Sequence, residues 1–248
     1  MTAWLKIVGL GPGNEAMITS EVHAALADAT DALGYFPYVN RISERPGLTL
    51  HASDNREELS RAKQALELVE AGKKVVMLSS GDPGVFAMAS AVFEVVDTGK
   101  PSWRELEIKV LPGITAMLAV SASVGAPLGH DFCCINLSDN LKPWSLIENR
   151  VRAAASVDLA MAFYNPRSKS RPAGFGKILN LLSEACERER VLIFAKDVTT
   201  PKESILITTL GEATEEMADM RTLVIIGSSK TRIIDRSGNS FVYTPRCA

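Results

Sequence analysis

The sequence predicts an α/β fold built from two α/β domains with mixed, largely parallel sheets. Short apolar runs rich in β-branched residues alternate with longer segments that have the periodicity or composition of helices. Loops rich in glycine and proline follow several of the apolar runs. Apolar strands alternating with helices are typical of helices that cover a largely parallel sheet.

The clearest helix of the first half is predicted at residues 55–72. Leu59, Ala62, Leu66 and Val69 share one face of this helix, and Gly72 ends it. Other apolar runs predict strands, and alanine-rich segments of helical length predict two further helices. The strands are expected at 4–9, 74–80 and 108–111, and the helices at 85–96 and 115–125.

The second half repeats this alternation. Strands are expected at 132–137, 159–164, 190–195, 204–210 and 222–227, and helices near 144–155, 176–186 and 212–220. Only the segment KDVTTPKE (196–203) separates two of these strands. It is too short for a helical crossover, so we expect an antiparallel hairpin there. The small-residue stretch 121–131 predicts a domain boundary, with domains at 1–120 and 121–248.

The composition is that of an ordinary globular protein. The chain has 248 residues, 46% of them hydrophobic, and a net charge of −2, which argues against nucleic acid as the main partner. It has neither an apolar stretch of membrane-spanning length nor a signal peptide, so a cytoplasmic location without membrane association is expected. The four cysteines form no CxxC pair and the three histidines are scattered, so we expect no metal site and no disulfide framework.

The loops at the carboxyl ends of strands are the candidate ligand sites, because open α/β sheets bind ligands there. The first loop, GLGPG (9–13), resembles a dinucleotide fingerprint but has Asn14 where GxGxxG requires glycine. This departure disfavours an NAD-linked enzyme, which stays an alternative. A glycine turn that lets a helix pack close to a strand explains the loop equally well.

Three further loops carry polar side chains. Asp82 follows the strand at 74–80 and could cap a helix or face a ligand. Thr115 could likewise cap the next helix or offer its hydroxyl to a ligand. Asn165 begins a basic loop, which is either a solvated surface or a grip for carboxylates or phosphates. The basic residues of this loop are Arg167, Lys169 and Arg171.

Six motifs together resemble the tetrapyrrole (corrin/porphyrin) methylase family. They are GLGPG, SSGDPGVF, LPGITA, AFYNPRS, AKDVTTPKE and TLVIIGSS, in this order and near the family spacing. The resemblance implies S-adenosylmethionine as cofactor, a cleft between two α/β domains that holds it, and a homodimer. The implied cofactor contacts are Ser80, Gly81, Asp82, Val85, Thr115, Ala116, Asn165, Val198 and Thr222.

Two segments, PLGHDFCCINLSD and FYNPRSKSRP, resemble the family members that methylate precorrin-3B at C17 and contract the ring to precorrin-4 in cobalamin biosynthesis. The alternatives are another precorrin or cobalt-precorrin methyltransferase of the family, including a cobalt-factor III C17-methyltransferase, and a tetrapyrrole carrier without activity.

The resemblance implies an acidic tetrapyrrole substrate. The candidate substrate contacts are Gly11, Pro12, Arg167, Lys169 and Arg171, with Lys230 and Arg232 as second candidates. Methyl transfer to a ring carbon needs two aligned ligands more than a protein nucleophile. Ring contraction needs proton transfers, for which His130 and Asp131 are the candidates. Alternatively, Asp131 caps a turn and His130 packs against the linker. Cys133 and Cys134, within an apolar run, are expected to be unreactive core residues.

Overall fold

The computed structural model describes residues 3–247. Contacts within the chain divide it into two compact units, Met1–Thr115 (unit 1) and Ala116–Ala248 (unit 2). The boundary predicted between residues 120 and 121 falls inside helix α5, Ala116–Val124, which opens unit 2.

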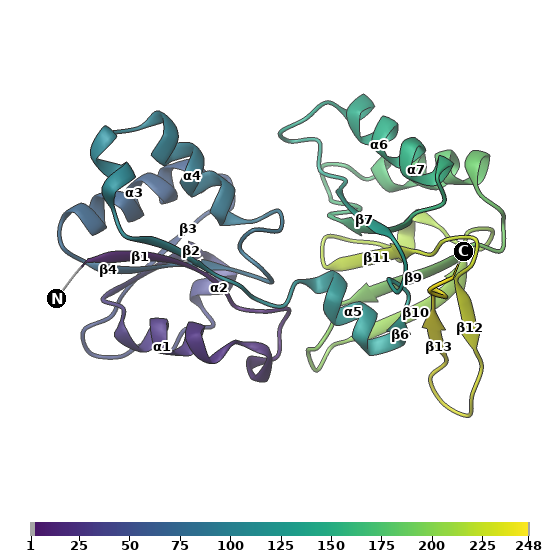
Figure 1. The fold of residues 1–248 in the computed structure, drawn as a ribbon, viewed down its shortest axis with the longest axis horizontal. Coiled ribbons are helices and arrows are strands. Elements are labelled where there is room, and N and C mark those ends of the chain that lie inside the picture. Colours follow the sequence, from purple (N-terminus) through teal and green to yellow (C-terminus); the bar gives the residue numbers. More distant parts are fainter. Residues whose placement is uncertain (1–2, 248) are drawn as a thin grey trace. The chain divides into compact units, whose positions relative to one another are not determined.

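Unit 1 is a parallel sheet with helices on both faces (Figure 1). The strand order is β3-β2-β4-β1-β5, and all pairs are parallel, so all carboxyl ends lie at one edge. The strands are β1 (Trp4–Gly9), β2 (Asp31–Tyr35), β3 (Thr49–Ser53), β4 (Lys74–Ser79) and β5 (Ile108–Leu111). The helices are η1 (Glu15–Met17), α1 (Ser20–Asp28), α2 (Phe36–Val39), α3 (Glu58–Glu70), α4 (Met88–Thr98) and η2 (Pro101–Glu105).

Strand β4 shows why the apolar runs of unit 1 are continuous. Val75 and Met77 belong to the core cluster beneath α3 and α4, whereas Val76 and Leu78 belong to the cluster beneath α1. Successive side chains of a strand point to opposite faces, so a strand covered on both faces needs an apolar residue at every position. The continuous apolar run that predicted this strand therefore follows from its burial on both faces.

The predicted helix at 55–72 is confirmed as α3, with one difference on its buried face. Ala62, Leu66 and Val69 are buried, but Leu59 is 54% exposed. Arg61 is buried instead, and its Nε keeps a hydrogen-bond partner there by donating to Ser53 Oγ at 2.8 Å.

Unit 2 has a mixed sheet of order β10-β9-β11-β8-β7. β7 and β8 are parallel, whereas β11 runs antiparallel to β8 and β9, and β10 antiparallel to β9. The predicted hairpin between β9 and β10 is confirmed. The strands are β7 (Phe132–Asn136), β8 (Ala160–Tyr164), β9 (Val191–Lys196), β10 (Ser204–Thr209) and β11 (Thr222–Ile226). Helices α6 (Trp144–Ser156) and α7 (Gly174–Ala185) supply one core cluster, and α5 supplies another.

The helix predicted at 212–220 is wrong, because only the single turn η3 (Glu215–Met217) forms there. Thr214 and Ala218 on either side are extended. The Asp219 backbone N–H donates to Thr222 Oγ1 at 3.1 Å, and Thr222 Oγ1 donates back to Asp219 Oδ1 at 2.9 Å. These local bonds offer the backbone a turn in place of a helix.

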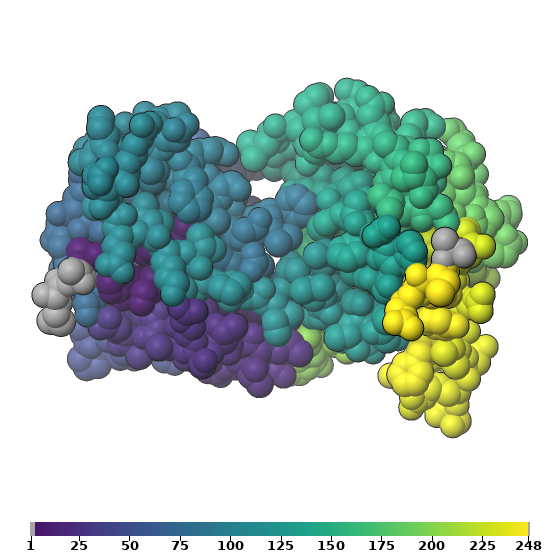
Figure 2. Space-filling view, in the orientation of Figure 1, coloured from purple at the N-terminus to yellow at the C-terminus, as the bar shows by residue number. Residues whose placement is uncertain are grey.

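A small third sheet completes unit 2. It joins β6 (Gly125–Ala126), β13 (Phe241–Tyr243) and β12 (Arg232–Ile234), with β13 parallel to β6. The hairpin of β12 and β13, yellow in Figure 2, stands out from the rest of unit 2.

Candidate active site

Three loops meet at the carboxyl edge of the unit 1 sheet. Gly9 ends β1, Gly81 follows β4 and Gly113 follows β5. A Cβ on Gly113 would lie 2.2 Å from the Gly81 carbonyl oxygen, and a Cβ on Gly9 would lie 2.5 Å from it. Such distances exclude any side chain, so glycine at these positions lets the three backbones touch. Close packing is thus one role of the GLGPG loop.

Gly11 and Gly81 tie two of these loops together. The Gly81 N–H donates to the Gly11 carbonyl at 2.9 Å, and the Gly11 N–H donates to the Gly81 carbonyl at 3.2 Å. Both residues have positive φ, 65° and 62°. The bridge therefore depends on a conformation that glycine adopts without strain.

The Asp82 carboxylate joins the second loop to the third. Its Oδ1 accepts from the Gly84 N–H at 2.8 Å, and its Oδ2 accepts from the Gly113 N–H at 3.0 Å. Asp82 does not cap α4, whose N-cap is Ala87. A carboxylate oxygen accepts more than one hydrogen bond, so these contacts leave acceptor positions for a ligand. The neighbouring Ser80 and Val85 are half-buried.

Arg41 holds the glycine loop from the side of β2. Its Nη2 donates to the Leu10 carbonyl at 2.9 Å and to the Gly13 carbonyl at 3.3 Å. The sequence pattern gave no signal for Arg41, because the strand that precedes it, β2, was not predicted. Pro12 lies between the two carbonyls that Arg41 holds.

The candidate residues of unit 2 gather at one edge of its sheet. Asn165 follows the carboxyl end of β8, and Val198 follows that of β9. Thr222 begins β11 opposite Lys196 at the end of β9, because these strands are antiparallel. Asn165 has φ of +51°, which asparagine tolerates, and its Nδ2 donates to Asn136 Oδ1 at 3.1 Å. Sequence positions far apart thus reach one edge.

The LPGITA segment lies where the two units join in sequence. Thr115, the last residue of unit 1, is buried, and Ala116, the first of unit 2, is half-buried. Within unit 2, the Met117 N–H in the first turn of α5 donates to the Tyr164 hydroxyl at 3.0 Å. This bond fixes the start of α5 to the end of β8.

The basic residues of the loop after β8 differ in their contacts. The Arg171 side chain is 12% exposed and donates from Nη1 to the carbonyls of Leu137 and Asn165 at 3.0 and 3.4 Å. Its Nε also lies 3.4 Å from Asp139 Oδ1. Arg171 therefore braces the loop. Lys169 is exposed, and Arg167, half-buried, donates from Nε to the Pro172 carbonyl at 2.9 Å.

His130 and Asp131 lie at the other edge of the unit 2 sheet. They precede β7, which runs parallel to β8 with Phe132 opposite Ala160. The amino end of β7 is thus separated from Asn165 by the length of the strands. The Asp131 N–H donates to His130 Nδ1 at 2.7 Å, and the Asp131 side chain is 87% exposed. Unit 2 does not bring this pair to the edge that carries Asn165.

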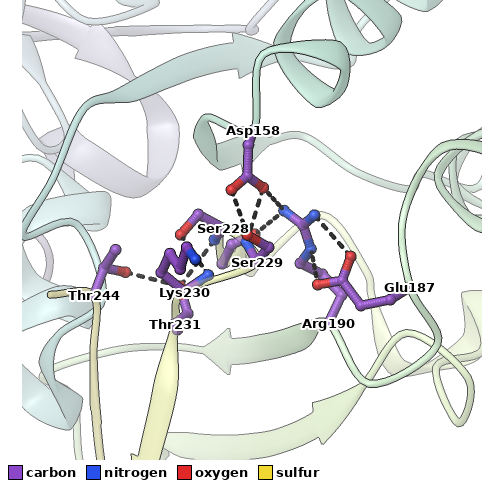
Figure 3. A network of polar contacts seen from close by, with 9 residues as sticks. Asp158, Glu187, Arg190, Ser228, Ser229, Lys230, Thr231 and Thr244 are labelled. Carbon is purple, nitrogen blue, oxygen red and sulfur yellow. Dashed lines mark hydrogen bonds and ion pairs between the residues drawn. The ribbon is translucent and has the colours of Figure 1, made fainter. Parts of the chain in front are cut away.

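A polar network occupies that same second edge (Figure 3). Arg190, 4% exposed, donates from Nη1 to the Gly227 carbonyl and pairs with Asp158 at 2.8 Å. Asp158 also accepts from the Ser229 N–H and hydroxyl at 2.8 and 2.6 Å. Burial raises the pKa of Asp158, but the hydrogen bonds from Ser229 and the contacts with Arg190 lower it by more. The net result is a pKa below the ordinary value.

The network fixes the turn that carries Lys230, and Arg232 begins β12 just beyond it. Because β11 is antiparallel to β8 and β9, this turn follows the end of β11 that lies away from Asn165 and Val198. Lys230 and Arg232, the second candidates for substrate contact, are thus separated from Asn165 and Val198 and lie at the edge that carries His130.

Cys133 and Cys134 are half-buried, and burial raises the pKa of Cys134 to about 12. Among residues 3–247, no group of three His, Cys, Asp or Glu side chains is placed to hold a metal ion. Over the same residues, no helix has the length and apolar character needed to span a membrane.

Comparison with known proteins gives consistent matches over the whole chain. A protein of Sinorhizobium sp named precorrin-3B C(17)-methyltransferase is 51% identical over 247 residues, 99% of this chain and 97% of that protein. A Salmonella typhimurium protein named probable cobalt-factor III C(17)-methyltransferase is 37% identical over 98% of each chain.

The crystal structure of the methyltransferase CobJ superimposes with a TM-score of 0.94 at 58% identity, covering 98% of this chain and 100% of that chain. The likeness confirms the α/β fold predicted from the sequence. The family model described as Tetrapyrrole (Corrin/Porphyrin) Methylases matches residues 5–214. The chain therefore belongs to the tetrapyrrole (corrin/porphyrin) methylase family.

Proposed function

We propose that this protein is an S-adenosylmethionine-dependent C-methyltransferase that methylates precorrin-3B at C17, with ring contraction to precorrin-4, in cobalamin biosynthesis. The observation that carries the proposal is the 51% identity to the Sinorhizobium precorrin-3B C(17)-methyltransferase over nearly the whole of both chains. Its test is incubation of the purified protein with precorrin-3B and S-adenosylmethionine, followed by mass and absorbance spectra of the product. Absence of a methylated, ring-contracted product would refute it.

The cofactor proposal assigns residues in each unit separately. In unit 1, Ser80, Gly81, Asp82, Val85 and Thr115 would contribute to binding. In unit 2, the contributing residues would be Ala116, Asn165, Val198 and Thr222. The fit rests on two features of unit 1: Gly9 and Gly113 pack against the Gly81 carbonyl so closely that a Cβ would collide with it, and the Asp82 carboxylate held beside them keeps acceptor positions for a ligand. When bound, the cofactor supplies a methyl group on a sulfonium centre.

The protein's part in this chemistry is to align two ligands and to exclude competing geometries. Loops held by backbone bridges are suited to that task, because a bridged loop has little freedom left to lose on binding. Gly11 and Pro12 would contact the tetrapyrrole substrate. Arg167 and Lys169 would attract its carboxylate arms, and Arg171 would act by bracing their loop. His130 and Asp131, the sequence candidates for the proton transfers, are left out of this proposal, because unit 2 places them at the sheet edge away from Asn165.

A second candidate function is the methylation of cobalt-factor III, favoured by the 37% identity to the Salmonella protein. Parallel assays with precorrin-3B and with cobalt-factor III separate the two, because each product has its own mass and spectrum. Substantially faster turnover of the cobalt form would replace the first proposal by the second.

We also propose a homodimer in the cytoplasm, on the family resemblance. Light scattering of the purified protein measures the mass in solution, and fractionation of the native host measures the location. A monomeric mass at micromolar concentration, or recovery outside the cytoplasmic fraction, would contradict the respective proposal.

A further inference from the structure

Arg41 is placed among the candidate ligand loops of unit 1 by two elements. It follows α2, which comes directly after the carboxyl end of β2. Its guanidinium reaches the glycine loop at the carboxyl end of β1, where Nη2 donates to the carbonyls of Leu10 and Gly13. Strands β2 and β1 flank β4 in the sheet, so Arg41 spans both sides of the strand that leads to Asp82.

Holding the loop uses one nitrogen of three. Nη2 carries two N–H groups, and each has a carbonyl partner. Among residues 3–247, no protein group accepts from Nε or Nη1, and no carboxylate forms an ion pair with Arg41. Arg41 is exposed as a residue. Arg41 therefore keeps the N–H groups of Nε and Nη1 available, and each can donate a charge-assisted hydrogen bond to a carboxylate oxygen.

Partial desolvation strengthens the attraction of this charge for an anion. Burial of the guanidinium against the loop lowers the pKa of Arg41 from its ordinary value, opposed by Tyr38 and Glu15 nearby. The group nevertheless stays protonated at neutral pH. A fixed, partly desolvated cation binds a carboxylate more strongly than a mobile surface lysine does.

We propose that Arg41 anchors a carboxylate arm of the acidic tetrapyrrole substrate beside the Gly11–Pro12 turn. This inference rests on the proposed function and adds a charged side chain of unit 1 to the proposed substrate contacts. The anchored geometry distinguishes Arg41 from Arg171, whose Nε and Nη1 are both occupied.

Arg45 is the matched control. The two N–H groups of its Nη2 are shared among the carbonyls of Leu26, Ala27 and Ala29, at 2.9, 2.9 and 2.6 Å. These carbonyls lie at the end of α1, before the amino end of β2, and thus at the opposite edge of the sheet. Arg45 therefore braces backbone in the same way as Arg41 but away from the candidate ligand loops.

The experiment compares Arg41→Gln, Arg41→Lys and Arg45→Gln with the wild type. We measure KM and kcat with precorrin-3B, S-adenosylmethionine affinity by calorimetry, and binding of uroporphyrin III, a stable acidic tetrapyrrole, by absorbance titration. Arg41→Gln should raise KM and the uroporphyrin Kd about 10- to 100-fold, because a charge-assisted hydrogen bond to the substrate is lost. Arg41→Lys should fall between Arg41→Gln and wild type, and Arg45→Gln should match wild type. The loss should be largest at low ionic strength.

Three results are decisive. Unchanged KM and uroporphyrin binding in Arg41→Gln overturn the inference while the methyltransferase proposal stands. Loss of S-adenosylmethionine affinity and of thermal stability in parallel with KM means that Arg41 is only a loop brace, which also overturns it. A wild type that binds uroporphyrin III but does not methylate precorrin-3B refutes the proposed function alone, and the Arg41 inference is then decided by the titration.

Discussion

The carboxylate of Asp82 accepts a hydrogen bond from the backbone N–H of Gly113, joining residues that lie 31 positions apart in the chain. Through this bond the loop after β4 takes its position from the loop after β5. Both loops carry proposed cofactor contacts, so the geometry of one depends on the other.

The first prediction concerns this bond. Asp82→Ala should raise the Kd for S-adenosylmethionine about tenfold or more, because two backbone N–H groups lose a charged acceptor. Asp82→Asn should cost less, since its amide oxygen keeps one of the two bonds. Calorimetry on folded protein measures both, with Asp97→Ala, at a side chain 82% exposed, as control. Unchanged affinity in folded Asp82→Ala would remove Asp82 from the site.

The second prediction concerns Gly113. A methyl group there would lie 2.2 Å from the Gly81 carbonyl, so Gly113→Ala should push the loops apart and weaken cofactor binding at least tenfold. Gly174→Ala is the matched control, because its Cβ meets only Trp144 ring atoms at 3.5 and 3.6 Å. Calorimetry and thermal melts would show the contrast; equal behaviour of the two variants would contradict the close-packing argument.

A third prediction concerns His130, which the sequence made a candidate for proton transfer. Its place before β7, at the edge of unit 2 away from Asn165, leads us to expect that His130→Ala keeps cofactor affinity and the yield of ring-contracted product within about threefold of wild type, in the range of a surface substitution. The measurement is the mass and absorbance spectrum of the product. Accumulation of a methylated but uncontracted product would instead establish a catalytic role.

The fourth prediction is a pH dependence of stability. The pKa of Asp158 is lowered in the folded protein from its ordinary value of 3.8. Its contribution is therefore present above that value and lost as the pH falls through the folded pKa. Because the Asp158 side chain is 39% exposed and solvent screens its charge, Asp158→Asn should lower the free energy of unfolding by only about 1 kcal/mol at pH 7, and this difference should shrink below pH 3.8.

Urea unfolding across the pH range measures this effect. Asp97→Asn, in an exposed pair with Arg104, should change stability little at any pH. A difference between Asp158→Asn and wild type that is constant down to acid pH would show that the carboxylate charge plays no part.

The sequence predicted those helices and strands whose burial produces a recognisable pattern of apolar residues. Strand β4 is buried on both faces, and α3 has a buried stripe that includes Leu66 and Val69, so both were found. Strands β2 and β3 and helix α1 were missed. β3 lies at the sheet edge, where its residues are exposed or half-buried, and β2 contains Gly34 in a run of only five residues, DALGY.

The residues of the candidate site were predicted for a different reason. Motifs such as SSGDPGVF mark loops directly, but the partners that hold them come from remote positions that carry no local signal. Arg41 reaches Leu10 across 31 residues. The separation of His130 from Asn165 follows from the parallel pairing of β7 and β8, which the order of elements alone does not fix.

The pairing of β13 with β6 sets the order in which the protein is able to fold during synthesis. Unit 1 has its last strand once Leu111 has left the ribosome. Unit 2 begins at α5, whose Val120 and Val124 share a core cluster with Val242, and Thr244 donates to the Pro127 carbonyl at 2.6 Å. Part of the apolar surface of α5 therefore stays uncovered in the nascent second unit until Val242 has been synthesised.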